Sequence, residues 1–327
     1  MEKLYLSKNI EKILDKLDDS RLGNKVGIKV HFGEKGSVTY LNPEIVKKIC
    51  NKVKELGKDV SLVECNVLYR GSRTTREEHI KTAKEHGFDF APIDILDGEK
   101  GERFVEVETK EGKAKLGKGI QNYDSLIVLS HFTGHIAAGF GAALKNMGMG
   151  FGSRAGKLHM HSNITPFVNK SNCIGCQTCI QNCNANAIKL IDGKAEINKN
   201  KCEGCTMCIA VCPQQAIGLP WEDETKGVLQ KRIVNYSEAV MNLFGKKIVF
   251  INVLENITKD CDCFGIIQEP IMEDIGILTG NDIVAIDKAS LDLIKEKGKD
   301  LDGQVQIDYA AEKELGSKDY EIIDLDK

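Results

Sequence analysis

The sequence CIGCQTCIQNCNANAI at residues 173–188 returns in altered form as CEGCTMCIAVCPQQAI at residues 202–217. Every cysteine of the first copy maps onto a cysteine of the second, and both copies end in Ala-Ile. A repeat this short and this rich in cysteine predicts one small module whose two halves are related by an approximate two-fold axis.

Within each copy the cysteines follow the spacing C-x2-C-x2-C-x3-C, which is typical of bacterial proteins with two 4Fe–4S clusters. Three closely spaced thiolates bind one cluster, and the fourth cysteine points the other way and binds the second cluster. Zinc sites instead use two well-separated Cys-x2-Cys pairs, so two tight runs of four disfavour zinc. The spacing predicts two sets of metal ligands, which are Cys173, Cys176, Cys179 and Cys212 for one cluster and Cys183, Cys202, Cys205 and Cys208 for the other.

Small residues separate the first two ligands of each set, and we expect Gly175 and Gly204 to let the backbone approach the inorganic sulfide. Pro213 follows the last cysteine, as the motif expects, whereas Asn184 stands where the first copy would carry proline. Residues 166–217 resemble the bacterial two-cluster ferredoxins, and this resemblance implies transfer of single electrons at low potential. Exposed clusters are labile to oxygen, so we expect an anaerobic host or a reducing niche.

On both sides of this module, segments with strand and helix patterns alternate. Strands are predicted at residues 25–30, 60–63, 125–130, 247–253 and 320–325, and helices at 43–56, 76–86, 228–244 and 291–297. This alternation predicts an α/β host domain with a mostly parallel sheet, interrupted by a small ferredoxin-like α+β iron–sulfur module. Residues 1–17 mix charged residues with Leu and Ile and predict an amphipathic helix.

We favour insertion of the module at residues 166–217 into one α/β domain, because a ferredoxin module has neighbouring termini and fits into a surface loop. The first segment of that domain is then residues 1–165 and the second is residues 218–327. Two separate small domains on either side of the module are the alternative.

Polar loops follow three of the predicted strands, at residues 31–36, 65–73 and 130–135. Ligands of open α/β sheets bind at the carboxyl ends of strands, so the three loops predict a shared pocket. A glycine-rich segment at residues 138–150 follows, and its amides are suited to hold an anion. The candidate catalytic residues are Cys65, His131, His135 and Lys145, because His and Lys supply protons or bind an anionic substrate.

Four cysteines lie outside the module. Cys50 falls on the apolar face of a predicted helix, and we expect it in the core. For Cys65, a packing role and a functional role in the pocket are equally compatible with the sequence. Cys261 and Cys263 form a Cys-Asp-Cys run that admits a metal-ligand pair, a redox pair or two packed thiols. Two thiolates cannot complete a four-ligand site, so a further metal site or cluster would need Cys65, a nearby His or Asp, or the partner in a homodimer.

Other polar residues have less specific patterns. His159 and His161 precede the module and line either a site or the junction with it. We expect Asp282 and Asp287 to cap helices or turns.

Several segments resemble the family called domain of unknown function 362, over nearly the whole chain. They are KVHFGEKG, ECNVLYRGSR with His79, SHFTGHIAAGFGAALKNMGMG, SRAGKLHMHS, CDCFG and DIGILTGNDIVAIDKASLDLI. Members of this family often carry an inserted two-cluster ferredoxin, and the resemblance implies no activity. The stretch from His135 to Lys145 is also similar to the nickel-pincer lactate racemase family, which suggests a related fold.

Charge and composition also limit the partners and the compartment that we expect for the protein. The chain has 327 residues with 45 Lys plus Arg and 48 Asp plus Glu, so its formal net charge of −3 favours neither nucleic acid nor an anionic membrane as a partner. No signal peptide is visible, so we expect a cytoplasmic protein whose 12 cysteines bind metal or carry out redox chemistry.

The first functional hypothesis is an iron–sulfur electron-transfer protein, a candidate ferredoxin-linked oxidoreductase. It would pass low-potential electrons between a soluble redox partner, such as a ferredoxin or reductase, and a site in the α/β domain that takes an unknown small molecule. A pure electron carrier with the α/β domain as a docking platform is one alternative. A binding module that handles a metal or metallocofactor is another.

Overall fold

The computed structural model describes residues 1–327 except 69–70, 162–164, 184, 203–206, 211 and 219–222. Its centre is an eight-stranded sheet with the strand order β16-β1-β15-β14-β7-β2-β3-β4. These strands are β1 (Glu2–Ser7), β2 (Lys25–Lys29), β3 (Asp59–Glu64), β4 (Ile93–Ile95), β7 (Ser125–His131), β14 (Ile248–Leu254), β15 (Gly276–Gly280) and β16 (Tyr320–Asp324). Only β15 runs against its neighbours, so the prediction of an α/β fold with a mostly parallel sheet is confirmed.

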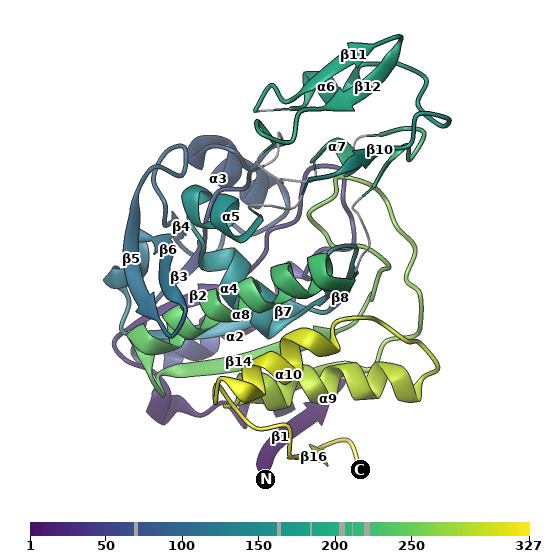
Figure 1. Ribbon diagram of the computed structural model, residues 1–327. Helices are drawn as coiled ribbons and strands as arrows, with labels where there is room; N and C mark the ends of the chain where they lie inside the picture. Colours follow the sequence, from purple (N-terminus) through teal and green to yellow (C-terminus); the bar gives the residue numbers. More distant parts are fainter. Residues whose placement is uncertain (69–70, 162–164, 184, 203–206, 211, 219–222) are drawn as a thin grey trace.

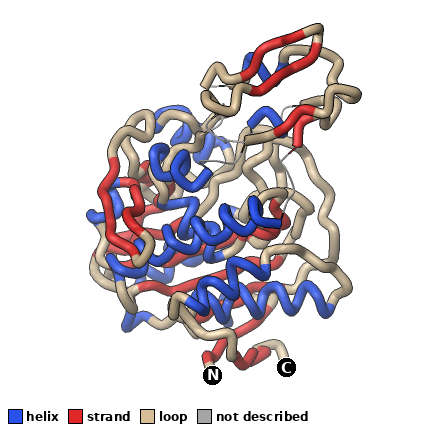
Figure 2. The backbone as a smooth tube through the Cα atoms, in the orientation of Figure 1, coloured by secondary structure: helices blue, strands red, loops and turns tan. Residues whose placement is uncertain are grey.

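Helices cover both faces of this sheet (Figures 1 and 2). One face carries α4 (Ala143–Phe151), α5 (Arg154–His161), α8 (Asp223–Phe244), α9 (Ile283–Glu296) and α10 (Gln304–Glu312), and the other α1 (Ile10–Leu14), α2 (Pro43–Glu55) and α3 (Arg76–Glu85). Strand β7 shows how the sheet separates two cores. Leu126 and Val128 pack on the first face, while Ile127 and Leu129 pack on the second. Successive side chains of a strand alternate between faces, so a central parallel strand must be apolar throughout.

The sheet takes strands from both sides of the cysteine-rich segment. Strand β14 follows that segment in the chain, yet it pairs in parallel with β7, which precedes it. Strand β1 at the amino end pairs with both β15 and β16. The two flanking segments of the chain therefore build a single sheet.

The prediction of one amphipathic helix over residues 1–17 is wrong. Residues Glu2–Ser7 form strand β1, and a helix begins only at Ile10, where the Asn9 side chain accepts the N–H of Glu11. Leu4 and Leu6 lie on the face that packs against the first core. Pairing with strands from the far end of the chain overrides the local helical pattern.

Two further helices extend beyond their predicted starts. Helix α9 begins at Ile283 rather than at residue 291, because Asp282 accepts the N–H groups of Val284 and Ala285 and caps its first turn. Helix α8 begins at Asp223 rather than at residue 228.

Two antiparallel hairpins are separate from the central sheet. They are β5 (Phe104–Thr109) with β6 (Gly112–Gly117) and β8 (Thr133–His135) with β9 (Gly139–Gly141). The cysteine-rich module, residues 166–217, lies outside the sheet at the upper end of the molecule in Figure 1. Its elements are β10 (Phe167–Val168), α6 (Thr178–Gln181), β11 (Ile188–Ile191), β12 (Lys194–Ile197) and α7 (Met207–Ala210), closed by β13 (Ile217–Gly218). Strand β10 pairs with β13, and β11 pairs with β12.

Candidate functional site

The three polar loops after β2, β3 and β7 line a single cavity of about 660 Å³. This volume lies within the usual range for sites that bind small molecules. Cys65, His131, His135 and Lys145 all line it, together with the loop that carries Cys261 and Cys263. The hairpin β8–β9 brings His135 to the cavity, and helix α4 supplies Lys145.

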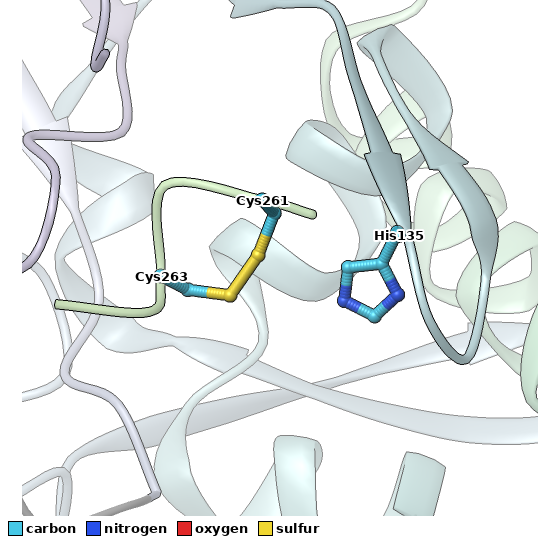
Figure 3. Close-up of side chains that lie close together, drawn as sticks. All are labelled: His135, Cys261 and Cys263. Carbon is cyan, nitrogen blue, oxygen red and sulfur yellow. A yellow bond between two sulfur atoms is a disulfide. The ribbon is translucent and has the colours of Figure 1, made fainter. Parts of the chain in front are cut away.

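Cys261 and Cys263 are joined by a disulfide, the only one among the residues that the structure describes. His135 faces this disulfide across the cavity (Figure 3), and its ligand atom and both sulfurs lie within 4.8 Å of one another. Cys261 is only 5% exposed, whereas Cys263 is partly exposed. The arrangement is a redox-capable sulfur pair with an imidazole beside it.

The ring nitrogens of His135 have different roles. Its Nδ1 accepts the N–H groups of Ala137 at 3.1 Å and Ala138 at 2.9 Å. Burial and the nearby ammonium of Lys145 hold the pKa of His135 well below its usual range, so the ring is neutral. Since Nδ1 accepts, the single proton lies on Nε2, and Figure 3 shows the nitrogen that is farther from the strand turned toward the disulfide. His135 therefore offers a hydrogen-bond donor to the sulfurs rather than a lone pair.

His131 has no free nitrogen. Its Nδ1 lies 2.7 Å from a carboxylate oxygen of Asp262, and its Nε2 lies 2.7 Å from the carbonyl oxygen of Glu255. Burial by itself lowers the pKa of His131, but the Asp262 carboxylate and the Glu255 carbonyl raise it above the usual value. Both nitrogens donate to oxygen acceptors, so His131 is a positioning residue that fixes the loop between the two cysteines.

Asp262 holds the same loop through other contacts. Its carboxylate accepts the hydroxyl of Thr39 at 3.3 Å, and its carbonyl accepts the N–H of Glu34 at 2.9 Å. A Cβ on Gly36 would lie 2.7 Å from the carbonyl oxygen of Gly265, so the two loops meet backbone to backbone. The disulfide is thus presented on a loop that is fastened to the loop after β2.

Most cations that line the cavity are paired. Lys29 Nζ lies 3.0 Å from a carboxylate oxygen of Glu64, and both side chains are buried. Arg73 Nε lies 3.2 Å from Glu34. Lys157 Nζ donates to the carbonyl of Gly152 at 2.6 Å. These contacts satisfy the buried charges within the protein, as burial requires.

Lys145 differs from them. Within the described part of the chain, no hydrogen bond or ion pair engages its ammonium group. Burial lowers the pKa of Lys145 to about 8, although the Asp262 carboxylate opposes that shift. The side chain is therefore still mainly cationic at neutral pH, and it faces the cavity without a partner.

Two amides of the glycine-rich segment are taken by the protein itself and are not available to an external anion. Asp287 is fully buried, and its two carboxylate oxygens accept the N–H groups of Ala143 and Leu144 at the start of α4. A carboxylate of the protein itself thus occupies the anion-binding end of the helix. Asp282 and Asp287 are both helix caps, as the sequence predicts.

Cys50 is fully buried in the second core, as expected, and burial raises its pKa to about 12. Cys65 is also fully buried, and its Sγ lies 3.5 Å from the carbonyl oxygen of Phe151. Burial raises the pKa of Cys65 well above its usual range, so it is a protonated thiol in the wall of the cavity.

The other histidines that the sequence analysis names lie in three different environments. His161 lines the cavity, and burial lowers its pKa to about 4. His159 does not line it, and its Nδ1 lies 3.1 Å from the Tyr236 hydroxyl. His79 is fully buried edge-on to Phe32 and does not line the cavity.

The cysteine-rich module brings together the set that the spacing predicts for one cluster. Its four cysteines line one small cavity, Cys173, Cys176, Cys179 and Cys212. Backbone N–H groups point at two of these sulfurs, from Ala195 to Cys173 at 3.4 Å and from Ala216 to Cys212 at 3.2 Å. Of the second set, Cys183, Cys202 and Cys208 are described, whereas Cys205, Gly204 and Asn184 lie outside the described residues.

Gly175 has a role that the sequence does not reveal. It has φ +69°, and a Cβ there would lie 2.3 Å from the carbonyl oxygen of Gly193 in the β11–β12 turn. In this structure, the absence of a side chain at Gly175 therefore lets its backbone approach the turn between β11 and β12.

Among the described residues, two side chains of the module contact the α/β domain. Asn182, the residue before Cys183, lines the large cavity. Ile209, the residue after Cys208, packs against both the core of the module and the first core of the α/β domain. Two cysteines of the second set are therefore next in sequence to residues that contact the α/β domain.

The family model described as domain of unknown function (DUF362) matches residues 26–292. The chain belongs to the DUF362 family. No protein among the curated proteins matches the sequence. No helix among the described residues of this DUF362 chain is long and apolar enough to cross a membrane.

Two solved structures are similar to this DUF362 protein in fold. The lactate racemase apoprotein from Thermoanaerobacterium thermosaccharolyticum has 14% identity and a TM-score of 0.43, and the match covers 90% of this chain and 57% of that one. A structural-genomics target protein from Thermotoga maritima has 14% identity and a TM-score of 0.41, with 93% and 58% covered. The chain thus spans less than two thirds of the length of either.

Sequence reasoning missed several residues of this DUF362 site. Glu34, Glu64 and Asp262 were not candidates, although each carboxylate contacts a cation or imidazole at the cavity. A lysine within the apolar strand β2 is the signal that could have revealed the Lys29–Glu64 pair, since a buried cation requires a partner.

Proposed function

We propose that this chain is an iron–sulfur electron-transfer protein that passes low-potential electrons between a soluble donor and the Cys261–Cys263 pair in the cavity of the α/β domain. The observation that supports the proposal is that a residue of the cysteine-rich module lines the cavity of the α/β domain. Asn182 lines the cavity that holds the disulfide, and its neighbour Cys183 belongs to the cysteine-rich module.

The described donor atoms of the module support one of the two proposed 4Fe–4S clusters. Four cysteines around one small cavity match the predicted ligand set, and N–H groups directed at sulfur are the kind of contact that tunes such clusters. Bound there, the clusters would supply single electrons at low potential. A ferredoxin-like module within the α/β domain is part of this proposal.

The chain's own residues place the first ligand set at the outer end. Ile174 is 62% exposed and Cys176 is exposed, so a soluble donor can approach them. A delivery side toward the α/β domain is supported by Ile209, which follows Cys208 in sequence and packs against the first core of that domain. This order gives the module an entry side and a delivery side.

At the cavity the pair undergoes a balanced two-electron reduction. Two electrons and two protons convert the Cys261–Cys263 disulfide into two thiols. The Nε2–H of His135 faces the sulfurs and stabilises a developing thiolate by hydrogen bonding. His131 and Asp262 keep the loop in position while the bond between the sulfurs breaks.

The test is to count thiols after one-electron reduction. Anaerobic protein is reduced with reduced ferredoxin as the donor, quenched with an alkylating reagent and analysed by peptide mass spectrometry. We expect alkylated Cys261 and Cys263 in the wild type and much less in Cys183→Ser, whose module lacks one ligand. Reduction of the module, seen by electron paramagnetic resonance, without any new thiol at positions 261 and 263 would contradict the proposal.

A second candidate function is metal handling, because His135, Cys261 and Cys263 place three ligand atoms close together. In the reduced protein, two thiolates and one imidazole would match part of a zinc site. The proton on Nε2 opposes this, since the nitrogen that faces the sulfurs has no lone pair to give. Stoichiometric zinc binding to reduced wild type, lost in Cys261→Ser, would favour metal handling over electron transfer at this pair.

A further inference from the structure

Most of the cations around the cavity have a partner within the protein. Lys29 is paired with Glu64, Arg73 with Glu34, and Lys157 with a carbonyl. Lys145 is the cavity-lining lysine for which the described residues offer neither a hydrogen bond nor an ion pair. One unpaired ammonium group matches a ligand with one negative charge.

The rest of the wall is largely apolar. Ile136, Met149, Leu229 and Ile233 line the cavity on the side of β8, α4 and α8, and Phe264 and Ile266 line it on the side of the disulfide loop. Sites of this kind bind the apolar body of a ligand and orient it with a few polar groups. The ligand that fits has a hydrocarbon body as well as a charged group.

The third feature of the cavity is the disulfide itself. Cys263 is partly exposed to the cavity, whereas Cys261 is 5% exposed. Thiol–disulfide exchange needs access to one sulfur, so exchange with a ligand would take place at Cys263 and leave Cys261 as the second thiol.

We propose that the substrate of this site is a small monocarboxylate with an apolar body and a thiol or disulfide group. Its carboxylate pairs with Lys145, its hydrocarbon part contacts the apolar wall, and its sulfur exchanges with Cys263. This inference rests on the proposed function, in that it assigns the molecule with which the Cys261–Cys263 pair exchanges electrons.

The exchange is balanced. A substrate thiol, as thiolate, attacks Cys263 Sγ, the Cys261–Cys263 bond breaks, and Cys261 leaves as a thiolate that takes the proton lost by the substrate. A second substrate thiol attacks the substrate sulfur of the mixed disulfide and releases the substrate disulfide, and both cysteines are then thiols. In the reverse direction, the reduced pair converts a substrate disulfide into two thiols.

The binding part of the test uses probes without sulfur, so it is independent of electron transfer. Calorimetric titration of anaerobic, oxidised protein with octanoate and with octan-1-ol compares a carboxylate with an uncharged chain of equal length. We expect octanoate to bind about tenfold more tightly, the size expected for a charge-assisted hydrogen bond. Lys145→Gln should remove this preference and still bind octan-1-ol, which shows that the cavity is intact.

The matched control is Lys246→Gln, which removes an exposed lysine in the turn before β14. It should leave the preference for octanoate unchanged. Equal affinity of wild type for octanoate and octan-1-ol, or a preference that survives in Lys145→Gln, would overturn the assignment of the carboxylate.

The exchange part uses 6-mercaptohexanoate and 6-mercaptohexan-1-ol, whose thiols are equally nucleophilic. Each is added to oxidised protein, and the mixed disulfide is measured by mass spectrometry. We expect 6-mercaptohexanoate to react about tenfold faster in wild type but not in Lys145→Gln, with the adduct on Cys263. Equal rates, or an adduct on Cys261 alone, would overturn the proposed substrate.

The two parts separate this inference from the function on which it rests. Exchange that follows the charge of the probe, together with failure of reduced ferredoxin to produce thiols, would refute delivery of electrons and leave the substrate class standing. Delivery of electrons to the disulfide, with no preference of the cavity for the carboxylate probes, would refute only the proposed substrate class.

Discussion

The two sulfur-rich regions of this protein differ in what surrounds their cysteines. In the module, cysteines make up much of the small buried cluster, with only a few aliphatic side chains such as Ile188 and Ile217. At the cavity, the Cys261–Cys263 loop belongs to the α/β domain, which has two large cores, and the contact between His131 and Asp262 fastens it. Because a small region with few apolar contacts rarely folds on its core alone, we expect the module to depend on bound metal for its stability, and we expect the cavity region to fold without metal.

Removal of iron should show the largest difference between the regions. Chelation under anaerobic conditions is expected to unfold residues 166–217, because their core is too small without metal ligation. The α/β domain should keep its sheet, since the buried residues that form its two cores come from outside the module. Amide hydrogen exchange measures this directly, with loss of protection in β11 and β12 and unchanged protection in β7 and β14. Loss of protection in both regions together would show that they form one cooperative unit.

Asp287→Ala should have the next largest effect, and it acts on the α/β domain alone. The change leaves the buried N–H groups of Ala143 and Leu144 without a partner and should lower the free energy of unfolding by about 3 kcal/mol. Asp282→Ala is the matched control, because Asp282 is a more exposed helix cap. This substitution should lower the free energy of unfolding by about 1 kcal/mol. Urea denaturation of the iron-loaded protein compares the two, and equal losses would contradict the special role of Asp287.

The same carboxylate gives a pH dependence. Burial raises the pKa of Asp287 from 3.8 to about 6, so the folded protein holds this proton more tightly than the unfolded chain. The contribution of Asp287 to stability should therefore fall as pH rises from about 4 to about 6. Unfolding measured across this interval should show that slope in wild type and a flatter one in Asp287→Asn.

Gly175→Ala should weaken the module without affecting the cavity. Its positive φ and the nearby Gly193 carbonyl leave no room for a Cβ. We expect a loss of roughly 1–3 kcal/mol in the module, seen as faster release of iron to a chelator. Gly193→Ala is a useful comparison, because its Cβ would meet nothing within 4 Å and only the positive φ opposes it. Equal rates of iron release in wild type and Gly175→Ala would show that the turn adapts.

The smallest effect concerns Lys145. Burial lowers its pKa to about 8, so the ammonium group that binds a carboxylate is lost as pH rises through that value. Octanoate affinity should fall about tenfold between pH 7.5 and pH 9.5, while octan-1-ol affinity should not change. The groups that face this lysine are Lys29, Glu64, Arg73 and Asp262, together with His135 and His161. An octanoate affinity that stays constant over this range would place the charge elsewhere.

These regions also differ in how far the sequence predicts them. In the module, spacing predicts that Cys173, Cys176, Cys179 and Cys212 come together, and they do line one small cavity. The shared cavity was also predictable, since the carboxyl ends of parallel strands meet at one edge of the sheet. Local spacing and a general rule of topology suffice for these two features.

Other features of the site and the fold depend on contacts between segments that are distant in the sequence. Nothing near residues 143–144 indicates that Asp287 takes their amides. Nothing near Lys145 in the sequence shows that it is the cavity-lining lysine without a partner among the described residues. The first strand was misread as a helix because its partners, β15 and β16, lie at the other end of the chain. Pairing over such separations is set by the packed fold rather than by local pattern.

Iron and acid-labile sulfide per chain, measured in anaerobically purified wild type, test the central claim most directly. The account predicts about eight of each, with both clusters bound by the eight cysteines of the module. A content near twelve would place another cluster in the α/β domain and make Cys65, Cys261 and Cys263 its candidate ligands. Protein that contains zinc without sulfide would contradict the account, since no iron–sulfur electron transfer would then be available to the Cys261–Cys263 pair.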